Sequence, residues 1–566
     1  MKLKATDKAW YVSDFETTGQ NEYAITGRTR VWLYSVTNED GVIQEDGDSI
    51  DKFMDWCSRH HGALIYFHNL RFDGTFIMSW LLENEFPYEE NLLSHSKRGF
   101  NALIGEMGEY YQIKINFAPN RQVTIYDSLK LIPLAVRDIA KAFNLPLSKG
   151  IIDYDKYEIT EETLSYVHND VNIVALALRY FRDKGYTRMT IGSNAYHSFK
   201  ESCPIFPMLF PRLDKDFIEG WREAYRGGRS QVNPKYANKV LKNVYRFDLN
   251  SMYPSIMAHK LLPYGRPIKC DKPGKYRFEL YEIAVHFKLK KGHLPTLLKT
   301  GSLFNKSGDT YYVDSEFVID IKISSIDLEL LYRHYDVYYI EYKQIWGFKC
   351  VEGIFENWVN TMYENKSKFT GGLRLVYKLL LNSLYGKFGS KAVGINKIPY
   401  IGEDGTLEFK NTEEHEMSLY YMPMAIAITS WAHKIIDDAI MTVGYDNFVY
   451  CDTDSVHSLA KLPDEMIDNK ELGKFKLEGV EEISKYVRQK TYLYKQDGNW
   501  EITCAGMPLA IKNFIIDKYG DKVIDIFSIG LHIDENTEGI RPEQLKLMPH
   551  RVPGGVILKP VPFSLN

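Results

Sequence analysis

Residues 447–459 read NFVYCDTDSVHSL and place two acids, Asp452 and Asp454, among apolar and β-branched residues. Side chains two positions apart point to the same side of a strand, so both carboxylates are expected on one strand face. Carboxylates in apolar surroundings are costly unless a metal or another cation pairs with them. The stretch therefore predicts a metal-binding strand, and the alternative is a hairpin in which Asp-Thr-Asp is merely the turn.

A third acid, Asp248, lies in a similar strand-like segment, residues 246–254 (RFDLNSMYP). The helical segment between these stretches, residues 363–391, carries six basic residues against one acid. Four of its side chains follow steps of four, four and three and so share one helix face: Arg374, Lys378, Asn382 and Tyr385. Such cations can hold a triphosphate while the ring packs on a base. A solvated amphipathic helix is the alternative.

The N-terminal region has an acidic pattern of its own. Asp14 and Glu16 of SDFET are two positions apart in a strand-like run, and paired carboxylates suit Mg²⁺ or Mn²⁺. Asp73 follows a buried-looking strand in YFHNLRFD, and Tyr166 and Asp170 of YVHND share one helix face. A phenol beside a metal-bound carboxylate can hold an attacking water. The alternatives are a chance surface pair and an ordinary exposed helix pair.

Two further segments combine cations with groups that suit nucleic-acid contact. Residues 225–234, YRGGRSQVNP, place Arg226 and Arg229 beside glycines that permit close backbone approach, although a simple turn is an equal alternative. Lys490 and Tyr492 of RQKTY are expected on one strand face, where they suit a backbone phosphate.

The composition is that of an ordinary folded protein, with 566 residues, 45% hydrophobic and 25% charged. Lys and Arg number 70 against 74 Asp and Glu, so the net charge is −4 and any grip on nucleic acid must be local. The six cysteines are scattered without C-x-x-C spacing, and there is no apolar signal segment or bilayer-length stretch. We therefore expect an intracellular protein without a zinc or disulfide framework.

Strand-like and helix-like runs alternate over residues 1–185, which predicts an α/β domain. The turn-rich residues 184–211 are interpreted as a boundary. Recurring short strands over residues 276–348 predict a β-rich insertion. Residues 355–388 are expected to be helical with a break at Gly371 and Gly372, and a hairpin is expected at residues 398–409.

The order of the motifs matters more than any one of them. SDFET, HNLRFD and YVHND, followed by DLNSMYP, KLLLNSLYG, YCDTDS and KTY, resemble the exonuclease and polymerase motifs of family B DNA polymerases. YFHNLRFDG, IYDSLK, LPYGRP, RQKTY, CAGM and VPGGV are similar to the protein-primed polymerases of small tailed phages of the phi-twenty-nine type. The resemblance runs nearly end to end. It implies a multidomain α/β and α+β fold, with a ribonuclease-H-like 3′–5′ exonuclease domain followed by a right-hand palm, fingers and thumb with two insertions.

By motif match, the resemblance implies the residues of an exonuclease site. The metal ligands would be Asp14, Glu16, Asp73 and Asp170, while Tyr166 would orient the water and Lys149 would assist. The frayed single strand would be held by Thr17, His68, Asn69, Phe72, Ser128 and Leu129.

The resemblance also implies a polymerase site. Asp248, Leu249 and Asp454 would bind two Mg²⁺ ions, for which Mn²⁺ would substitute, with Asp452 nearby. The nucleotide would contact Leu249, Tyr253, Lys366, Lys378, Asn382, Tyr385 and Gly386, and the Tyr253 ring would exclude a 2′-hydroxyl. Ser251, Lys490 and Tyr492 would position primer and template, while Tyr225, Arg226, Gly227 and Gly228 would bridge the two sites.

The implied division is exonuclease 1–189, palm 190–257, terminal-protein insertion 258–353, fingers 354–390, second insertion 391–421, palm 422–522 and thumb 523–566. The implied activity is replicative DNA synthesis with proofreading, primed on a terminal-protein hydroxyl and elongated processively with strand displacement. The implied partners are primer-template and single-stranded DNA, dNTPs and the terminal protein, in host bacterial cytoplasm and away from membranes, with a chain that is otherwise monomeric.

The chain departs from the family pattern at Ala425 and His433, where Gly and Arg are expected, and at Arg229-Ser230, where an aromatic pair is expected. These departures bear on template and terminal-protein contacts and leave the metal sites intact. Other functional classes fit less well. A nuclease alone has no use for Asp248, Asp452, Asp454 and Lys378. A single-strand binder would show a basic excess, and a reverse transcriptase would lack the acidic domain ahead of the palm.

Overall fold

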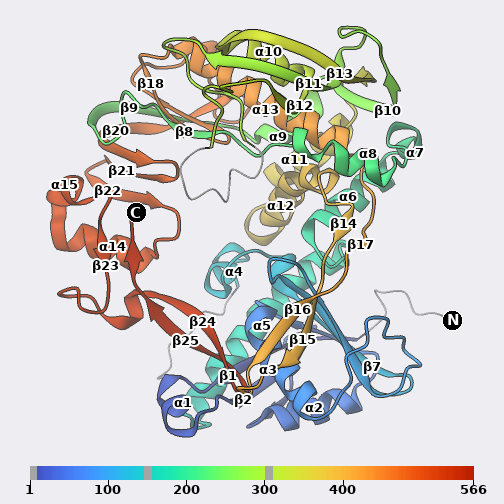
Figure 1. Ribbon diagram of the computed structural model, residues 1–566. Helices are drawn as coiled ribbons and strands as arrows, with labels where there is room; N and C mark the ends of the chain where they lie inside the picture. The colour runs from blue at the N-terminus through green and yellow to red at the C-terminus, as the bar shows by residue number, and fades with distance from the viewer. Residues whose placement is uncertain (1–8, 146–155, 300–309, 566) are drawn as a thin grey trace.

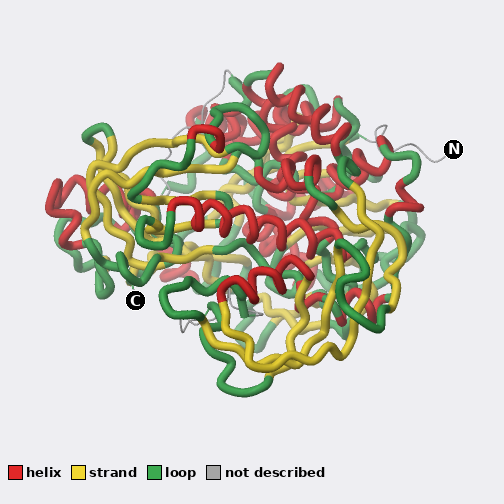
Figure 2. The backbone as a smooth tube through the Cα atoms, turned by 90° about the horizontal axis from the view of Figure 1, so that it is seen from above, coloured by secondary structure: helices red, strands yellow, loops and turns green. Residues whose placement is uncertain are grey.

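The computed structural model describes residues 9–145, 156–299 and 310–565 (Figure 1). The N-terminal part, blue to teal, forms the lower region in that view, and the C-terminal part, red, reaches down to it. Figure 2, seen from above, shows helices gathered between strand-rich regions on either side. Over the described ranges, no helix combines the length and the apolar character that a membrane span requires.

The first sheet has seven strands in the order β3-β2-β1-β4-β7-β6-β5. Strand β4 is parallel to β1 and to β7, and the other pairs are antiparallel. Alternate residues of the central strands enter two different cores: Ile65 packs with α2 and α3, and Tyr66 packs with α5. The predicted α/β organisation is therefore confirmed. The elements are β1 Trp10–Thr17, β2 Val31–Asn38, β3 Ile43–Gly47, α2 Ile50–Arg59, β4 Leu64–Phe67, α3 Leu70–Glu83, β5 Gly99–Ile104, β6 Tyr110–Ala118, β7 Arg121–Asp127 and α5 Glu161–Asp183.

The expectation that residues 184–211 are turn-rich is wrong, while their interpretation as a domain boundary stays a prediction. This segment contains α6 (Ile191–Ser202) and α7 (Phe206–Leu209), followed further on by α8 (Lys215–Gly220). Thr190 caps α6 by accepting a hydrogen bond from the Ser193 backbone N–H at 3.2 Å. Phe199 is buried in the core that also holds α12, so long-range packing outweighs the local turn signals of Gly, Ser and Asn.

A second seven-stranded sheet is antiparallel throughout and joins segments from distant parts of the chain, in the order β22-β21-β20-β9-β19-β18-β8. Helix α13 (Met422–Val443) packs on it, and α9 (Met252–His259) packs on α13. The strands are β8 Ser230–Val232, β9 Val240–Leu249, β18 Phe448–Asp452, β19 Ser455–Ser458, β20 Phe475–Arg488, β21 Thr491–Gln496 and β22 Asn499–Cys504.

Two expectations about this sheet are corrected. Strand β18 ends at Asp452 and pairs with Ser455, so Asp-Thr-Asp is the hairpin turn, with Thr453 at φ 57°. The two acids therefore do not lie on one strand face. The hairpin geometry of the alternative is right, whereas the predicted metal binding stays a prediction. Lys490 likewise lies in the turn before β21, at φ 54°, rather than on a strand face with Tyr492.

The predicted β-rich insertion is confirmed as a four-stranded sheet, β10-β13-β11-β12, with its own core. It lies at the top of Figure 1. Helix α10, which follows β12, packs against α13 and so joins the insertion to the second sheet. The elements are β10 Leu262–Lys269, β11 Phe278–Leu289, β12 Ile319–Ser324, α10 Ser325–His334 and β13 Tyr335–Val351.

The predicted helical break is also confirmed. Helix α11 spans Glu356–Lys368 and α12 begins at Gly371, which has φ 58°. A Cβ on Gly372 would lie 2.0 Å from the ring of Phe143, which directly follows α4 (Val136–Ala142). Glycine is therefore required at 372 by a close approach, and at 371 by the backbone conformation. Helix α12 ends at Phe388.

Two hairpins meet at the first sheet. The predicted hairpin is β15 (Lys397–Ile401) with β16 (Leu407–Asn411), and the other is β24 (Lys546–Val552) with β25 (Gly555–Val561). The Thr29 backbone N–H donates to the Pro553 carbonyl at 3.1 Å, and Phe409 packs on the guanidinium of Arg551. The chain thus returns to its N-terminal part (Figure 1). The remaining elements include α1 Gln20–Thr26, β14 Val393–Gly394, β17 His415–Glu416, α14 Leu509–Tyr519, α15 Val523–Ile526, β23 His532–Ile533 and β26 Phe563–Ser564.

Candidate active sites

The acids of the N-terminal motifs come together at the first sheet. Asp14 lies near the end of β1, Asp73 in the first turn of α3 and Asp170 in the middle of α5. All three line one cavity of about 170 Å³, together with His68, Asn69 and Phe72. Three motifs that are far apart in the sequence therefore form one site.

The electrostatics of this cavity favour a bound cation. Burial, followed by the negative charges of Asp14 and Glu16, raises the pKa of Asp73 well above its usual range. Oδ1 of Asp73 is buried and has no hydrogen-bond partner among the described residues. Carboxylate oxygens crowded in this way match the ligands that Mg²⁺ and Mn²⁺ prefer. In the ranges that the structure describes, no three His, Cys, Asp or Glu side chains are already arranged as a metal centre.

A loop held by Asp127 forms the rim of the cavity. The backbone N–H groups of Asn69 and Leu129 both donate to Oδ1 of Asp127, at 3.1 and 3.0 Å. Asn69 adopts the left-handed conformation, with φ 72°. Sequence reasoning missed Asp127, although its place at a strand end before Ser-Leu-Lys is a capping signal.

Not every residue expected to hold a single strand is available to do so. Ser128 is fully buried, and its hydroxyl lies 3.0 Å from the Phe67 carbonyl and 2.9 Å from Nδ1 of His68. The Ser128 side chain thus makes its contacts inside the protein, and its expected contact with DNA stays a prediction. Thr17, Asn69, Phe72 and Leu129 are at least partly accessible, Tyr166 is buried one turn before Asp170, and Lys149 lies outside the described residues.

The second group of acids lies at the turn between β18 and β19. Asp248 on β9 pairs with Ser455, and the Leu249 backbone N–H donates to the Asp454 carbonyl at 2.8 Å. Burial and the charges of Asp454 and Glu478 raise the pKa of Asp248 to about 7. Burial, followed by the charge of Asp452, also raises the pKa of Asp454. Asp248 and Asp454 are thus two carboxylates that repel each other.

Nearby lysines oppose this negative charge. Lys476, which sequence reasoning missed, is the cross-strand partner of Asp248 and opposes the rise in its pKa. Lys490 donates to both carboxylate oxygens of Asp452 at 2.8 Å. Asp452 is therefore already paired with a cation of the protein, which distinguishes it from Asp248 and Asp454.

Cations of α11 and α12 gather beside the second site. Burial and the charges of Arg374 and Lys378 lower the pKa of Lys366, and Lys366 Nζ lies 3.4 Å from Oγ of Ser251. Arg374, Lys378 and Asn382 are exposed, so the predicted stripe is open to solvent. A cluster of unneutralised cations of this kind is suited to phosphate groups.

Aromatic rings fill the space between α9 and α12. Tyr253 stacks on Tyr385, with ring centroids 3.8 Å apart and an interplanar angle of 20°. Burial and the charge of Tyr385 raise the pKa of Tyr225 to about 12, so the three rings lie near one another. Within the second sheet, Tyr492 of β21 stacks on Tyr486 of β20. Gly386 is exposed on α12.

Residues 225–230 run directly beside the acidic turn. A Cβ on Gly228 would lie 2.6 Å from Oγ1 of Thr453, and the Thr453 backbone N–H donates to the Arg229 carbonyl at 2.7 Å. Arg226, however, is buried, and its Nε donates to the Leu298 carbonyl at 3.0 Å. The Arg226 side chain thus makes a contact inside the protein, and its expected contact with DNA stays a prediction.

The raised pKa of Asp248 predicts a stability effect. A carboxyl whose pKa is raised from 3.8 to about 7 on folding costs stability as pH rises through that range, and the cost is fully present above it. We expect Asp248→Asn to stabilise the metal-free protein at about pH 8 by about 1–2 kcal/mol, allowing for solvent screening. Thermal unfolding in EDTA measures this.

The matched control is Asp446→Asn, at an exposed acid that pairs with Lys235 at 2.7 Å. That variant should gain no stability, because the pKa of Asp446 is lowered by its partner. Added Mg²⁺ should reduce the advantage of Asp248→Asn, since only the wild-type carboxylate can pair with the ion. A lower unfolding temperature for Asp248→Asn in EDTA would contradict the account of this site.

Comparison with known proteins shows the family to which the chain belongs. The family described as DNA polymerase type B, organellar and viral, matches residues 56–158 and 154–471. The DNA polymerase of Bacillus phage phi29 is 35% identical, and the alignment covers 100% of both chains. The DNA polymerase of Streptococcus phage Cp-1 is 32% identical over 90% of this chain and 94% of its own.

Solved structures give the same result. Phi29 DNA polymerase complexed with primer-template DNA and incoming nucleotide substrates superposes with a TM-score of 0.87 at 34% identity, covering 99% of this chain and 100% of that one. The same polymerase complexed with single-stranded DNA also gives a TM-score of 0.87. The expected fold, an exonuclease domain with palm, fingers and thumb, is therefore confirmed. The chain belongs to the organellar and viral type B DNA polymerases, and within them it is a DNA polymerase of the phi29 type.

Proposed function

We propose that this DNA polymerase is a replicative enzyme that copies a template at Asp248 and Asp454 and proofreads at Asp14, Glu16, Asp73 and Asp170. The observation that supports this most strongly is the presence of two separate acidic sites, one on each seven-stranded sheet. Both carry carboxylates whose pKa values are raised by burial and by neighbouring acids, as expected where a divalent cation binds.

At the proofreading site, Asp14, Glu16, Asp73 and Asp170 would hold Mg²⁺ or Mn²⁺, which activates water and stabilises charge on the phosphate. The end of a strand would enter the cavity next to Asn69 and Phe72, which line it. Asp127 fixes that rim through the Asn69 and Leu129 backbone N–H groups. A solved relative, phi29 DNA polymerase, is complexed with single-stranded DNA, which supports such a strand as a ligand of this chain.

At the polymerase site, Asp248, the Leu249 backbone and Asp454 would hold Mg²⁺, which lowers the pKa of the primer hydroxyl and offsets charge on the leaving pyrophosphate. Lys366 and Lys378 are placed to bind the triphosphate from α11 and α12. Lys490 neutralises Asp452 and leaves Asp248 and Asp454 as the acids that repel each other. Asn382, Tyr385 and Gly386 border the new base pair.

The Tyr253 ring is proposed to exclude ribonucleotides. It is held flat by the stack on Tyr385 and therefore cannot swing aside freely. We expect Tyr253→Val to raise the relative incorporation of rNTP over dNTP by about 10- to 100-fold, because loss of the ring makes room for the 2′-hydroxyl of the rNTP. Competitive incorporation of rATP and dATP opposite template T measures the ratio.

Tyr253→Phe is the matched control, because it keeps the ring and removes only the hydroxyl. It should reject rNTPs as the wild type does. Equal discrimination by Tyr253→Val and the wild type would rule out the steric role of the ring.

The remaining features of the proposal concern partners and domains. We infer that synthesis starts on a hydroxyl of a terminal protein that docks on the insertion at 258–353, and that the insertion at 391–421 helps to enclose DNA for processive strand displacement. The domain division would be 1–189, 190–257, 258–353, 354–390, 391–421, 422–522 and 523–566, and the enzyme would work in the host bacterial cytoplasm. The contact of Phe409 with Arg551, which joins the two hairpins, supports the enclosure.

Incubation with labelled dATP, Mg²⁺ and the cognate terminal protein tests this proposal. A covalent protein–nucleotide adduct that resists denaturation is expected, together with extension of ordinary DNA primers. Primer extension without any adduct would refute protein priming while leaving the polymerase assignment unaffected.

A further inference from the structure

His433 lies at a position where the chain departs from the family pattern, and it is buried in a polar environment. Only 3% of the residue is exposed. Nε2 lies 2.6 Å from the Gly227 carbonyl oxygen, and Nδ1 lies 3.3 Å from Oδ1 of Asp327 on α10. A carbonyl and a carboxylate both accept hydrogen bonds, so both ring nitrogens must carry a proton to make both bonds. The geometry therefore calls for an imidazolium.

The surroundings of His433 stabilise this charge. The Asp327 carboxylate also accepts from Ser324 Oγ at 2.9 Å and from Ser430 Oγ at 2.7 Å. Burial by itself would raise the pKa of Asp327, but the hydrogen bond and charge of His433, with the charge of Arg226, lower it instead. Arg226 in turn faces Glu223 and Tyr312. The ionised Asp327 thus has cations on two sides.

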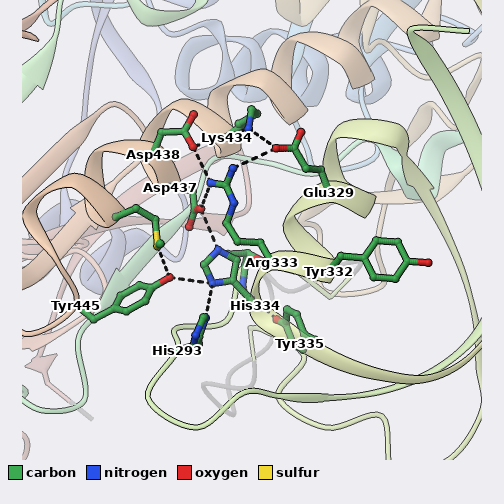
Figure 3. A network of polar contacts seen from close by, with 12 residues as sticks. His293, Glu329, Tyr332, Arg333, His334, Tyr335, Lys434, Asp437, Asp438 and Tyr445 are labelled. Atoms are coloured by element: carbon green, nitrogen blue, oxygen red, sulfur yellow. Dashed lines mark hydrogen bonds and ion pairs between the residues drawn. The ribbon is translucent and has the colours of Figure 1, made fainter. Parts of the chain in front are cut away.

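Arg229, at the second position that departs from the expected pattern, bonds to Asp437, which lies one turn after His433 on α13. Its guanidinium donates to Oδ1 of Asp437 at 3.0 Å, with both side chains almost fully buried. Figure 3 shows the other side of Asp437, where Arg333 and His334 of α10 both contact Oδ2 at 2.9 Å. The two departures therefore anchor one short segment, 227–229, to the same two helices.

That segment carries the acidic turn. Between the two anchors lies Gly228, which leaves room for Thr453 and would clash with it if it had a side chain. The Arg229 carbonyl accepts from the Thr453 N–H at 2.7 Å, and Ser230 pairs with Asp452 across β8 and β18. A displacement of the 227–229 backbone would therefore shift the turn that presents Asp454.

We propose that His433 is a positioning residue for the polymerase site: as an imidazolium it ties Gly227 to Asp327, and together with Arg229 it sets the placement of the Asp452–Asp454 turn. A cation at 433 is what this role requires. Arginine would satisfy the requirement at every working pH, whereas histidine satisfies it only while protonated.

Steady-state dNTP incorporation by the full chain tests the proposal with His433→Gln, His433→Arg and, as a matched control, His532→Gln. The control removes an exposed histidine whose Nε2 lies 3.5 Å from Asp534. We expect His433→Gln to lower kcat for incorporation by about 10-fold or more, because one charge-assisted hydrogen bond is lost. KM for dNTP and degradation of single-stranded DNA should be unchanged, and His433→Arg should retain incorporation.

The pH profile gives the decisive readout. An imidazolium can give up a proton where a guanidinium keeps its charge, so the incorporation rate of wild type relative to His433→Arg should fall as pH rises. Asp248 titrates in both proteins and cancels in this ratio. A ratio that stays constant with pH, or wild-type kcat in His433→Gln, would overturn the proposal. If His433→Gln also lost exonuclease activity through misfolding, the ratio of the other two proteins would still decide the outcome.

Discussion

Asp454→Asn should abolish dNTP incorporation, by at least about 10³-fold, while primer degradation continues at the wild-type rate. Asp454 shares its site with Asp248, and burial and the charge of Asp452 raise its pKa. An amide of the same shape keeps the hairpin between β18 and β19 but removes the charge that a divalent cation needs. Single-turnover extension of a primer with one dNTP measures the loss.

The control for Asp454→Asn is Asp464→Asn, an exposed acid that pairs with Lys461 at 2.6 Å. This variant should incorporate dNTPs normally, because the Asp464–Lys461 ion pair is on the surface and belongs to neither proposed site. If Asp454→Asn extended primers as fast as this control, Asp454 could not be a ligand of the catalytic metal.

The double variant Asp14→Ala/Asp73→Ala should show the opposite pattern. Removing two of the acids around the cavity takes away its charge for a cation, so degradation of single-stranded DNA should fall by at least about 10³-fold. Incorporation should remain within the wild-type range, since Asp14 and Asp73 lie on β1 and α3, whereas the proposed polymerase acids lie on β9 and at the turn between β18 and β19. Release of labelled 3′-nucleotide measures the degradation.

The same double variant also tests the stability of the protein and the separation of the two sites. Because the pKa of Asp73 is raised by burial and by its acidic neighbours, its removal should not destabilise the protein above neutral pH. Loss of both activities in the double variant would contradict the separation of the two sites.

Much of the candidate site follows from the sequence, for physical reasons that individual residues illustrate. Asp14 lies near the end of a strand and Asp170 on the buried face of a long helix, and these positions are set by simple periodicity. The break before α12 follows from glycine, whose conformational freedom is unusual at Gly371. In these cases, a local pattern and the tertiary structure favour the same arrangement.

Prediction from the sequence fails where contacts with distant parts of the chain determine the local conformation or the burial of a residue. Thr453 adopts a positive φ although threonine rarely does, because Gly228 and Arg229 hold the turn from another strand. The burial of Arg226 depends on the Leu298 carbonyl, which the insertion provides. Residue type alone contains no information on either contact.

The net charge of −4 is a further example. As a total, it argues against a protein that binds nucleic acid. In the structure, acids with raised pKa values gather at two sites, and Lys366, Arg374 and Lys378 gather beside one of them. Local charge, rather than the sum, is the quantity that relates to function.

The central claim is that one chain both corrects and extends a primer at two separate sites. Its most direct test is a primer-template with a mispaired 3′ end, supplied with Mg²⁺ and dNTPs and followed over time at single-nucleotide resolution. We predict that the wild type first shortens and then extends this primer, that Asp454→Asn only shortens it, and that Asp14→Ala/Asp73→Ala extends it slowly without shortening. Extension of the mispaired primer by the wild type without prior shortening, at the rate of the double variant, would contradict the claim.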